Sequence, residues 1–162
     1  MPGHAAHAVR RAGGRNGAAD TVTLDHEARF LRRRRLTTDG GRELHVDLPE
    51  AVALNDGDAF ETADGLLIAV RAADEPLTEV RGDGAAHLAR LAWHLGNRHL
   101  PVEVRDASLL IRRDLVIEAM LAGLGARLAA VEAPFSPEGG AYGHGRTHGH
   151  DHGHEALPHR HG

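Results

Sequence analysis

The chain of 162 residues contains no cysteine and no lysine, and only 3% of its residues are aromatic. Without thiols, disulfides and thiolate metal sites are excluded, so any metal chemistry must use imidazole and carboxylate groups. With so few aromatic residues, a core must be built from Leu, Val, Ile and Ala. No apolar run approaches the roughly 18 residues of a membrane-spanning helix, and the N-terminus lacks the apolar stretch of a secretory signal. We therefore expect no membrane association and a cytoplasmic location.

Charge and motifs also exclude several classes of function. The formal net charge is −4 with histidines neutral, which gives no general attraction to nucleic acid. RNA binding on a sheet would require exposed aromatic residues, and the expected strands 102–104 and 109–111 carry none. The chain has no H-E-x-x-H motif, no G-x-S-x-G motif and no glycine-rich phosphate loop. We therefore expect a protein that is not an enzyme and does not bind nucleic acid.

Histidine is abundant, and seven of the fourteen histidines lie in the last nineteen residues. Imidazole is a ligand for Ni²⁺, Cu²⁺ and Zn²⁺, and it is largely neutral near pH 7. Glycine spacers would let several rings fold around one ion, so we interpret residues 137–162 as a flexible tail that captures and releases metal. The candidate ligands in this tail are His144, His148, His150, His152, His154, His159 and His161.

The first half of the chain has the period of β-strands. Residues 1–20 are rich in Gly, Ala and Arg without periodicity, and we expect a disordered leader there. Over residues 21–75, apolar residues alternate with polar ones, most clearly at Leu44, Val46 and Leu48. Turn sequences such as DGG and NDGD separate these segments. The pattern predicts a small β-rich domain of the sandwich or barrel type.

The second half, residues 76–136, alternates between strand and helix patterns. Two segments have apolar residues at the i, i+3, i+4, i+7 spacing of an amphipathic helix, and Asp114 is a suitable N-cap for the second of them. Short apolar strands precede, separate and follow these helices. The resulting βαββαβ order predicts a ferredoxin-like domain, and an α+β class for the whole chain. We also expect Phe135 and Tyr142 to dock onto this domain before the tail begins.

Histidines outside the tail are less distinctive. His99 follows the expected end of the first helix and, taken alone, has the features of an ordinary surface histidine. His87 and His94 share that helix, but seven residues at about 1.5 Å each separate them by about 10 Å, too far for one ion. We expect His87 to be structural or solvated. His26 and His45 lie in expected strands and have no partners by spacing.

Three stretches together resemble one family. WHLGNRHLP at residues 93–101, FSPEGGAYGHGRTHGHDHGH from residue 135, and VTLDHEARFLRRRRLTTDGGREL from residue 22 are similar to UreE, the urease accessory metallochaperone family. The resemblance extends over residues 21–150. It implies a first domain likened to a peptide-binding module, and a ferredoxin-like second domain that binds metal and forms a homodimer.

The resemblance also implies a site and partners. The histidine of the family's GNRH segment corresponds to His99, and in relatives two copies of it bind one ion at the dimer axis. The expected cargo is Ni²⁺, with Zn²⁺ and Cu²⁺ as competitors. The expected recipients are the urease apoprotein and its accessory complex, which includes the GTPase UreG. The alternative is a histidine-rich protein that stores or buffers Ni²⁺, Cu²⁺ or Zn²⁺ without a link to urease, which would need the tail but not His99.

Overall fold

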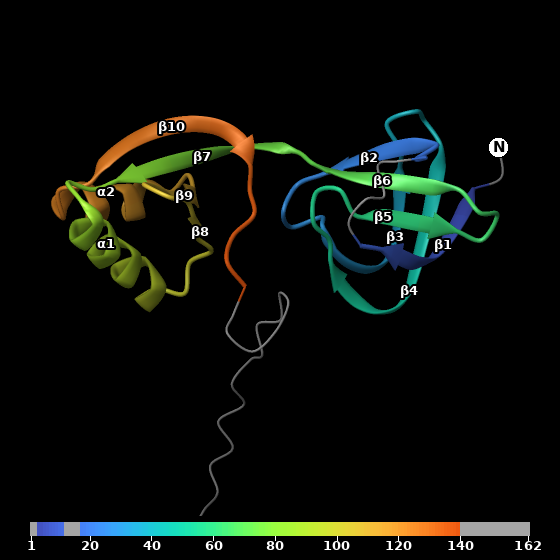
Figure 1. Cartoon of the computed structure of the whole chain (residues 1–162), viewed down its shortest axis with the longest axis horizontal. Coiled ribbons are helices and arrows are strands. Elements are labelled where there is room, and N and C mark those ends of the chain that lie inside the picture. The colour runs from blue at the N-terminus through green and yellow to red at the C-terminus, as the bar shows by residue number, and fades with distance from the viewer. Residues whose placement is uncertain (1–2, 12–16, 140–162) are drawn as a thin grey trace, which may run out of the picture.

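The computed structural model describes residues 3–11 and 17–139, which form two domains arranged side by side (Figure 1). The first domain contains a six-stranded sheet, and the second contains a four-stranded sheet with two helices. The α+β class expected from the sequence is therefore confirmed. Only Ala73 lies between the last strand of the first sheet, β6 (Leu67–Ala72), and the first strand of the second, β7 (Asp74–Arg81). In the described part of the chain, neither helix is long and apolar enough to cross a membrane.

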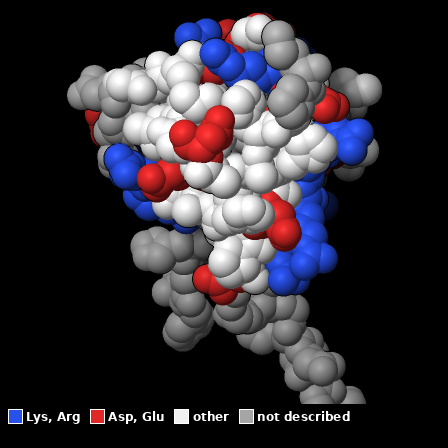
Figure 2. Space-filling model, turned by 90° about the vertical axis from the view of Figure 1, so that its right-hand side faces the viewer, with Lys and Arg blue, Asp and Glu red and all other residues white. Residues whose placement is uncertain are grey.

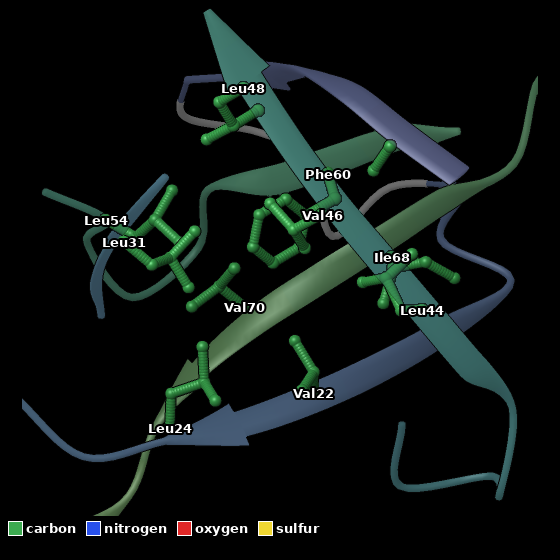
Figure 3. Close-up of a cluster of buried hydrophobic side chains, with 11 residues drawn as sticks. Val22, Leu24, Leu31, Leu44, Val46, Leu48, Leu54, Phe60, Ile68 and Val70 are labelled. Carbon is green, nitrogen blue, oxygen red and sulfur yellow. The ribbon is translucent and has the colours of Figure 1, made fainter. Parts of the chain in front are cut away.

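The first sheet has the strand order β2-β6-β5-β1-β4-β3. Two of its neighbouring pairs, β1 with β4 and β2 with β6, are parallel, and the other three pairs are antiparallel. Its inward side chains form one aliphatic core around Phe60 (Figure 3). The strands are β1 (His4–Arg10), β2 (Asp20–Leu24), β3 (Phe30–Thr37), β4 (Glu43–Ala53), β5 (Ala59–Thr62) and β6.

The expectation of a disordered leader is wrong for residues His4–Arg10. This segment is strand β1, which inserts between β4 and β5 and pairs with both. It contributes Ala6, which is fully buried in the core. The segment has few large apolar residues, so its sequence pattern is weak, but ladder hydrogen bonds on both sides order its backbone. Residues 12–16 of the expected leader lie outside the described part of the chain.

Asp20 connects the two ends of the first sheet. It starts β2, and its carboxylate accepts hydrogen bonds from the loop that follows β3: from the Thr38 hydroxyl (2.6 Å), the Arg42 guanidinium (2.8 Å) and the Gly40 N–H (3.0 Å). A Cβ atom on Gly40 would lie 2.6 Å from the carboxylate oxygen, so a larger residue there would displace the carboxylate. Burial alone would raise the pKa of Asp20, but these donors and the Thr21 N–H lower it to about 2.

The second sheet has the order β10-β7-β9-β8, with all three neighbouring pairs antiparallel. Both helices pack on one face, where Leu91 and Ile117 meet Val80 and other apolar residues of the sheet. The carboxylate of Asp114 accepts hydrogen bonds from the N–H groups of the first turn of the second helix, which confirms it as the N-cap. The elements are β7, α1 (Ala85–Asn97), β8 (Glu103–Val104), β9 (Leu109–Arg112), α2 (Leu115–Gly123) and β10 (Arg127–Pro134).

The segment that follows β10 covers the other face of this sheet. Phe135 is fully buried against Leu77 and Leu110, so its expected docking on the second domain is confirmed. The chain then runs towards β8, at the opposite edge of the sheet (Figure 1). Tyr142, the other aromatic residue expected to dock, lies outside the described residues.

We predict that Asp20→Asn lowers the free energy of unfolding by about 1–3 kcal/mol at neutral pH, because it removes the charge from a carboxylate with several donors. Because the native pKa of about 2 lies below the ordinary value of 3.8, this stabilisation is fully present above pH 3.8. It is lost as the pH falls towards about 2. Denaturant unfolding of both proteins across this range measures the difference.

Asp47→Asn is the matched control, because Asp47 is exposed and its side chain pairs with Arg33 at the surface, at 2.9 Å. Exposed pairs of this kind contribute about 0–1 kcal/mol. Equal losses for the two variants, or a loss at Asp20 that does not diminish in acid, would contradict the role assigned to Asp20.

Candidate functional site

Helix α1 ends in an unusual backbone conformation at His99. Arg98 and His99 donate backbone hydrogen bonds to Leu95 (3.1 Å) and Gly96 (3.0 Å), which closes the last turn. His99 then adopts φ 56°, and it is the only residue other than glycine with positive φ in the described part of the chain. This conformation costs a non-glycine residue about 1–2 kcal/mol. Such strain is concentrated at functional sites, so His99 is a candidate on backbone geometry as well as on residue type.

The imidazole of His99 is exposed, and no described residue makes a hydrogen bond to it. His87, which lies on α1, provides the contrast. Its Nδ1 accepts a hydrogen bond from the Asp83 N–H (2.9 Å), and its Nε2 donates to the Leu124 carbonyl (2.8 Å). Both ring nitrogens of His87 are therefore occupied, which confirms the structural role expected for it. His99 keeps a lone pair available for a metal ion.

Histidines of the first domain are engaged in local contacts. His4 pairs with Asp64 at 3.0 Å, and His7 lies 3.0 Å from the Asp47 carbonyl. His45 lies 3.6 Å from the Glu43 carboxylate. Within residues 3–11 and 17–139, no group of three or more His, Asp or Glu side chains is arranged to hold a metal ion. A complete coordination sphere at His99 therefore requires ligands from outside the described part of one chain.

His26 departs from the sequence expectation. It lies in the turn between β2 and β3 rather than in a strand, and its Nδ1 is 2.9 Å from the Arg112 guanidinium. Arg112 lies 86 positions along the chain, so residue spacing could not identify this partner. His26 is thus part of the contact between domains and not of the candidate metal site.

The root of the tail, residues 135–138, lies near the segment that follows His99. The Ser136 N–H donates to the Glu103 carboxylate, and the Glu138 N–H donates to the Val102 carbonyl, each at 2.8 Å. Val102 is only three residues beyond His99. The structure therefore brings the beginning of the tail to the His99 end of the second domain.

The predicted tail ligands themselves, His144 to His161, lie outside the described residues. His144 is five positions beyond Gly139, and an extended chain of that length spans up to about 17 Å. A tail that begins beside Val102 therefore has the length to bring His144 back to His99.

Trp93 is an exposed surface residue that the periodic patterns of the sequence do not identify. Its side chain is 65% exposed, and its ring packs edge-on against the His94 ring with 5.1 Å between centroids. It lies on α1 away from the buried residues Leu91 and Leu95. The sequence does hold a signal for an interface here, because Trp93 lies off the apolar stripe of its helix. A residue of this size is seldom left exposed without a partner.

Comparison with known proteins agrees with this two-domain arrangement. Residues 3–73 match the family model of the UreE urease accessory protein, N-terminal domain, and residues 75–162 match that of its C-terminal domain. The boundary between the two matches falls at the one-residue connection between the sheets.

Individual relatives are similar over most of their length. The urease accessory protein UreE of Rhodobacter capsulatus is 56% identical over 144 residues, which cover 89% of this chain and 90% of the relative. The UreE protein of Ruegeria pomeroyi is 53% identical, with 86% of this chain and 91% of the relative covered. That of Paracoccus denitrificans is 56% identical, with coverages of 78% and 79%. On these matches, the chain belongs to the UreE family of urease accessory proteins.

Proposed function

We propose that the protein is a homodimeric nickel carrier that collects Ni²⁺ with its tail and delivers it to apo-urease through His99. The observation that carries this proposal is the exposed His99 ring, which has no hydrogen-bond partner among the described residues and lies near the root of the histidine-rich tail. Membership of a urease accessory family supports urease as the destination. The function is transport rather than catalysis.

The proposed relay site uses two copies of His99. A single exposed imidazole binds an ion weakly, but a two-fold axis brings the same residue from both subunits together. Two imidazoles leave coordination positions open, which tail histidines can fill and a partner protein can take over. The sheet order β10-β7-β9-β8 and the βαββαβ element order support a ferredoxin-like fold for the domain that carries this site.

Trp93 supports a dimer contact close to His99. The two residues lie six positions apart at the same end of α1, and tryptophan is enriched among the residues that contribute most to protein interfaces. Covering its exposed ring with the partner subunit would remove apolar surface from water beside the proposed two-fold axis.

Affinity alone does not select nickel. Cu²⁺ binds imidazole sites more tightly than Ni²⁺, and Zn²⁺ competes for them. We therefore infer that recognition by the recipient decides which ion is delivered. The proposed recipients are the urease apoprotein and its accessory complex, including the GTPase UreG. Several tail imidazoles at high local concentration would keep the relay site supplied.

We predict that a chain truncated after Tyr142 binds one Ni²⁺ per dimer, and that His99→Ala in this background abolishes that binding. The change removes the only ligand that each subunit is proposed to supply to the axial site. Calorimetric titration gives the stoichiometry, and light scattering gives the mass of the species that binds.

Two histidines of α1 are matched controls for this experiment. His94→Ala removes an imidazole from the same helix and should leave the binding of one ion unchanged. His87→Ala should lower the unfolding midpoint, because both its ring nitrogens are hydrogen-bonded, but it should not change the stoichiometry. If His99→Ala binds nickel as its parent does, the relay site is wrong and a tail that only buffers metal becomes the better account.

We predict that Trp93→Ala raises the dimer dissociation constant by about 30-fold or more, the effect of losing about 2 kcal/mol at an interface. Sedimentation at several concentrations without metal measures the constant. Leu115→Ala is the control, since Leu115 is also an exposed apolar residue but lies on α2. Equal dissociation constants for Trp93→Ala and the unmodified protein would place the dimer contact elsewhere.

A further inference from the structure

The covalent link between the domains is short and leaves their orientation to side-chain contacts. Ala73 alone joins β6 to β7, and its N–H donates to the Leu24 carbonyl at 2.8 Å. The same carbonyl accepts a second hydrogen bond, from Nη1 of Arg29 at 3.2 Å. A one-residue link with a single backbone hydrogen bond would act as a hinge, so a second attachment is needed to fix the two domains.

Arg29 provides that second attachment. Its side chain comes from the turn before β3 and is only 3% exposed, and its Nη2 donates to the backbone carbonyl of Phe135 in the second domain. Burial lowers the pKa of Arg29, and the carboxylates of Glu75, Asp25 and Asp56 partly counter this effect. A buried guanidinium is retained only where charges and acceptors compensate its loss of water. One of the acceptors of Arg29 is the carbonyl of Phe135, the first residue of the tail root.

The ring of Phe135 contacts two more residues. The His26 ring meets it edge-on with 5.6 Å between centroids, and the Arg112 guanidinium lies 5.5 Å from its centre. Arg112 also donates from Nη2 to Nδ1 of His26 at 2.9 Å. An arginine cannot accept a hydrogen bond, so Nδ1 of His26 must be unprotonated and the ring neutral.

We propose that Arg29, His26 and Arg112 form an interdomain clamp on Phe135, through which the first domain positions the root of the tail beside His99. The clamp and the contacts of Ser136 and Glu138 with the β8 segment act in series along residues 135–138. The use of the clamp for metal transfer rests on the proposed function. The clamp itself does not depend on metal.

The clamp is sensitive to acid because of the groups that face His26. Arg112 from β9 and Arg29 from the turn before β3 are cationic. The carboxylate of Glu75 in β7 accepts a hydrogen bond from the backbone N–H of His26 at 3.0 Å, and Glu27 is adjacent in the chain. Burial lowers the pKa of His26, as do Arg112 and then Arg29, and the two glutamates oppose them. Protonation would remove the acceptor for Arg112 and add a third cation. The closed arrangement is therefore fully favoured above the ordinary pKa of about 6.5 and weakens as the pH falls below it.

Spin-label distances test the clamp directly, because the chain has no native cysteine. One labelled pair, Ala63→Cys with Ala89→Cys, reports the separation of the two domains. A second pair, Ala63→Cys with Glu138→Cys, reports the distance from the first domain to the tail root. Samples are metal-free and diluted with unlabelled chain, so that only distances within one subunit contribute. Failure of nickel binding at His99 would leave these distances unchanged, which separates this proposal from the proposed function.

Arg29→Met should broaden or shift both distance distributions at about pH 7.5, while the unmodified protein gives one narrow distribution for each pair. Arg10→Met is the matched control, because Arg10 is an exposed arginine of β1 that pairs with Glu61 at the surface, at 3.4 Å. Circular dichroism establishes that each variant is folded. Folded Arg29→Met with distributions identical to those of the unmodified protein would overturn the clamp.

His26→Gln tests the clamp without removing Arg29. The glutamine carbonyl can accept from Arg112, and it does not titrate. We expect the unmodified protein to open at about pH 5.5, and His26→Gln to keep the narrow distributions at both pH values. Opening of both proteins in acid, or of neither, would overturn the assignment of the acid response to His26. This comparison remains decisive even if Arg29→Met fails to fold.

Discussion

The burial of aliphatic side chains in two separate cores is the constraint on which the rest of the molecule depends. The first domain packs around Phe60 and the second between its sheet and its two helices. No histidine is buried in either core among the described residues, and the polar groups that are buried there are few. The proposed ligand His99 therefore lies at the surface, just past the end of α1. An ion bound at such places exchanges more readily than one enclosed in a core, which suits a carrier.

Regular patterns of apolar residues were sufficient to predict most elements. The first expected amphipathic helix is α1, Ala85–Asn97, which ends before His99 as expected, and the N-cap expected at Asp114 is present. These signals are local, because they depend on residues three or four positions apart. Strand β1 escaped prediction because it is stabilised by pairing with β4 and β5, about 40 and 50 positions away, rather than by its own apolar content. Ala6 of this strand packs in the core, but a single small alanine adds little to a pattern of alternating apolar residues.

Contacts between the domains and along the tail root could not be predicted either, because they also join residues that are far apart in the sequence. Arg29 and Phe135 are 106 positions apart, and neither residue type indicates the other as a partner. His99 could be predicted as a candidate site only through resemblance to a family, because the residue pattern around it is that of any helix end. The structure adds its positive φ, which spacing does not encode.

His87 and His99 show what decides whether a histidine of this protein can act as a ligand. Both are on or beside α1, and residue type and solvent access do not separate them well. The difference is that backbone groups occupy both ring nitrogens of His87, whereas the His99 ring has no such partner in the described part of the chain. A metal ion at His87 would have to displace two hydrogen bonds, one to the loop before α1 and one that joins α1 to the end of α2. At His99 an ion would displace no hydrogen bond of the described residues, so binding and release would leave the fold unchanged, which is the property that a carrier requires.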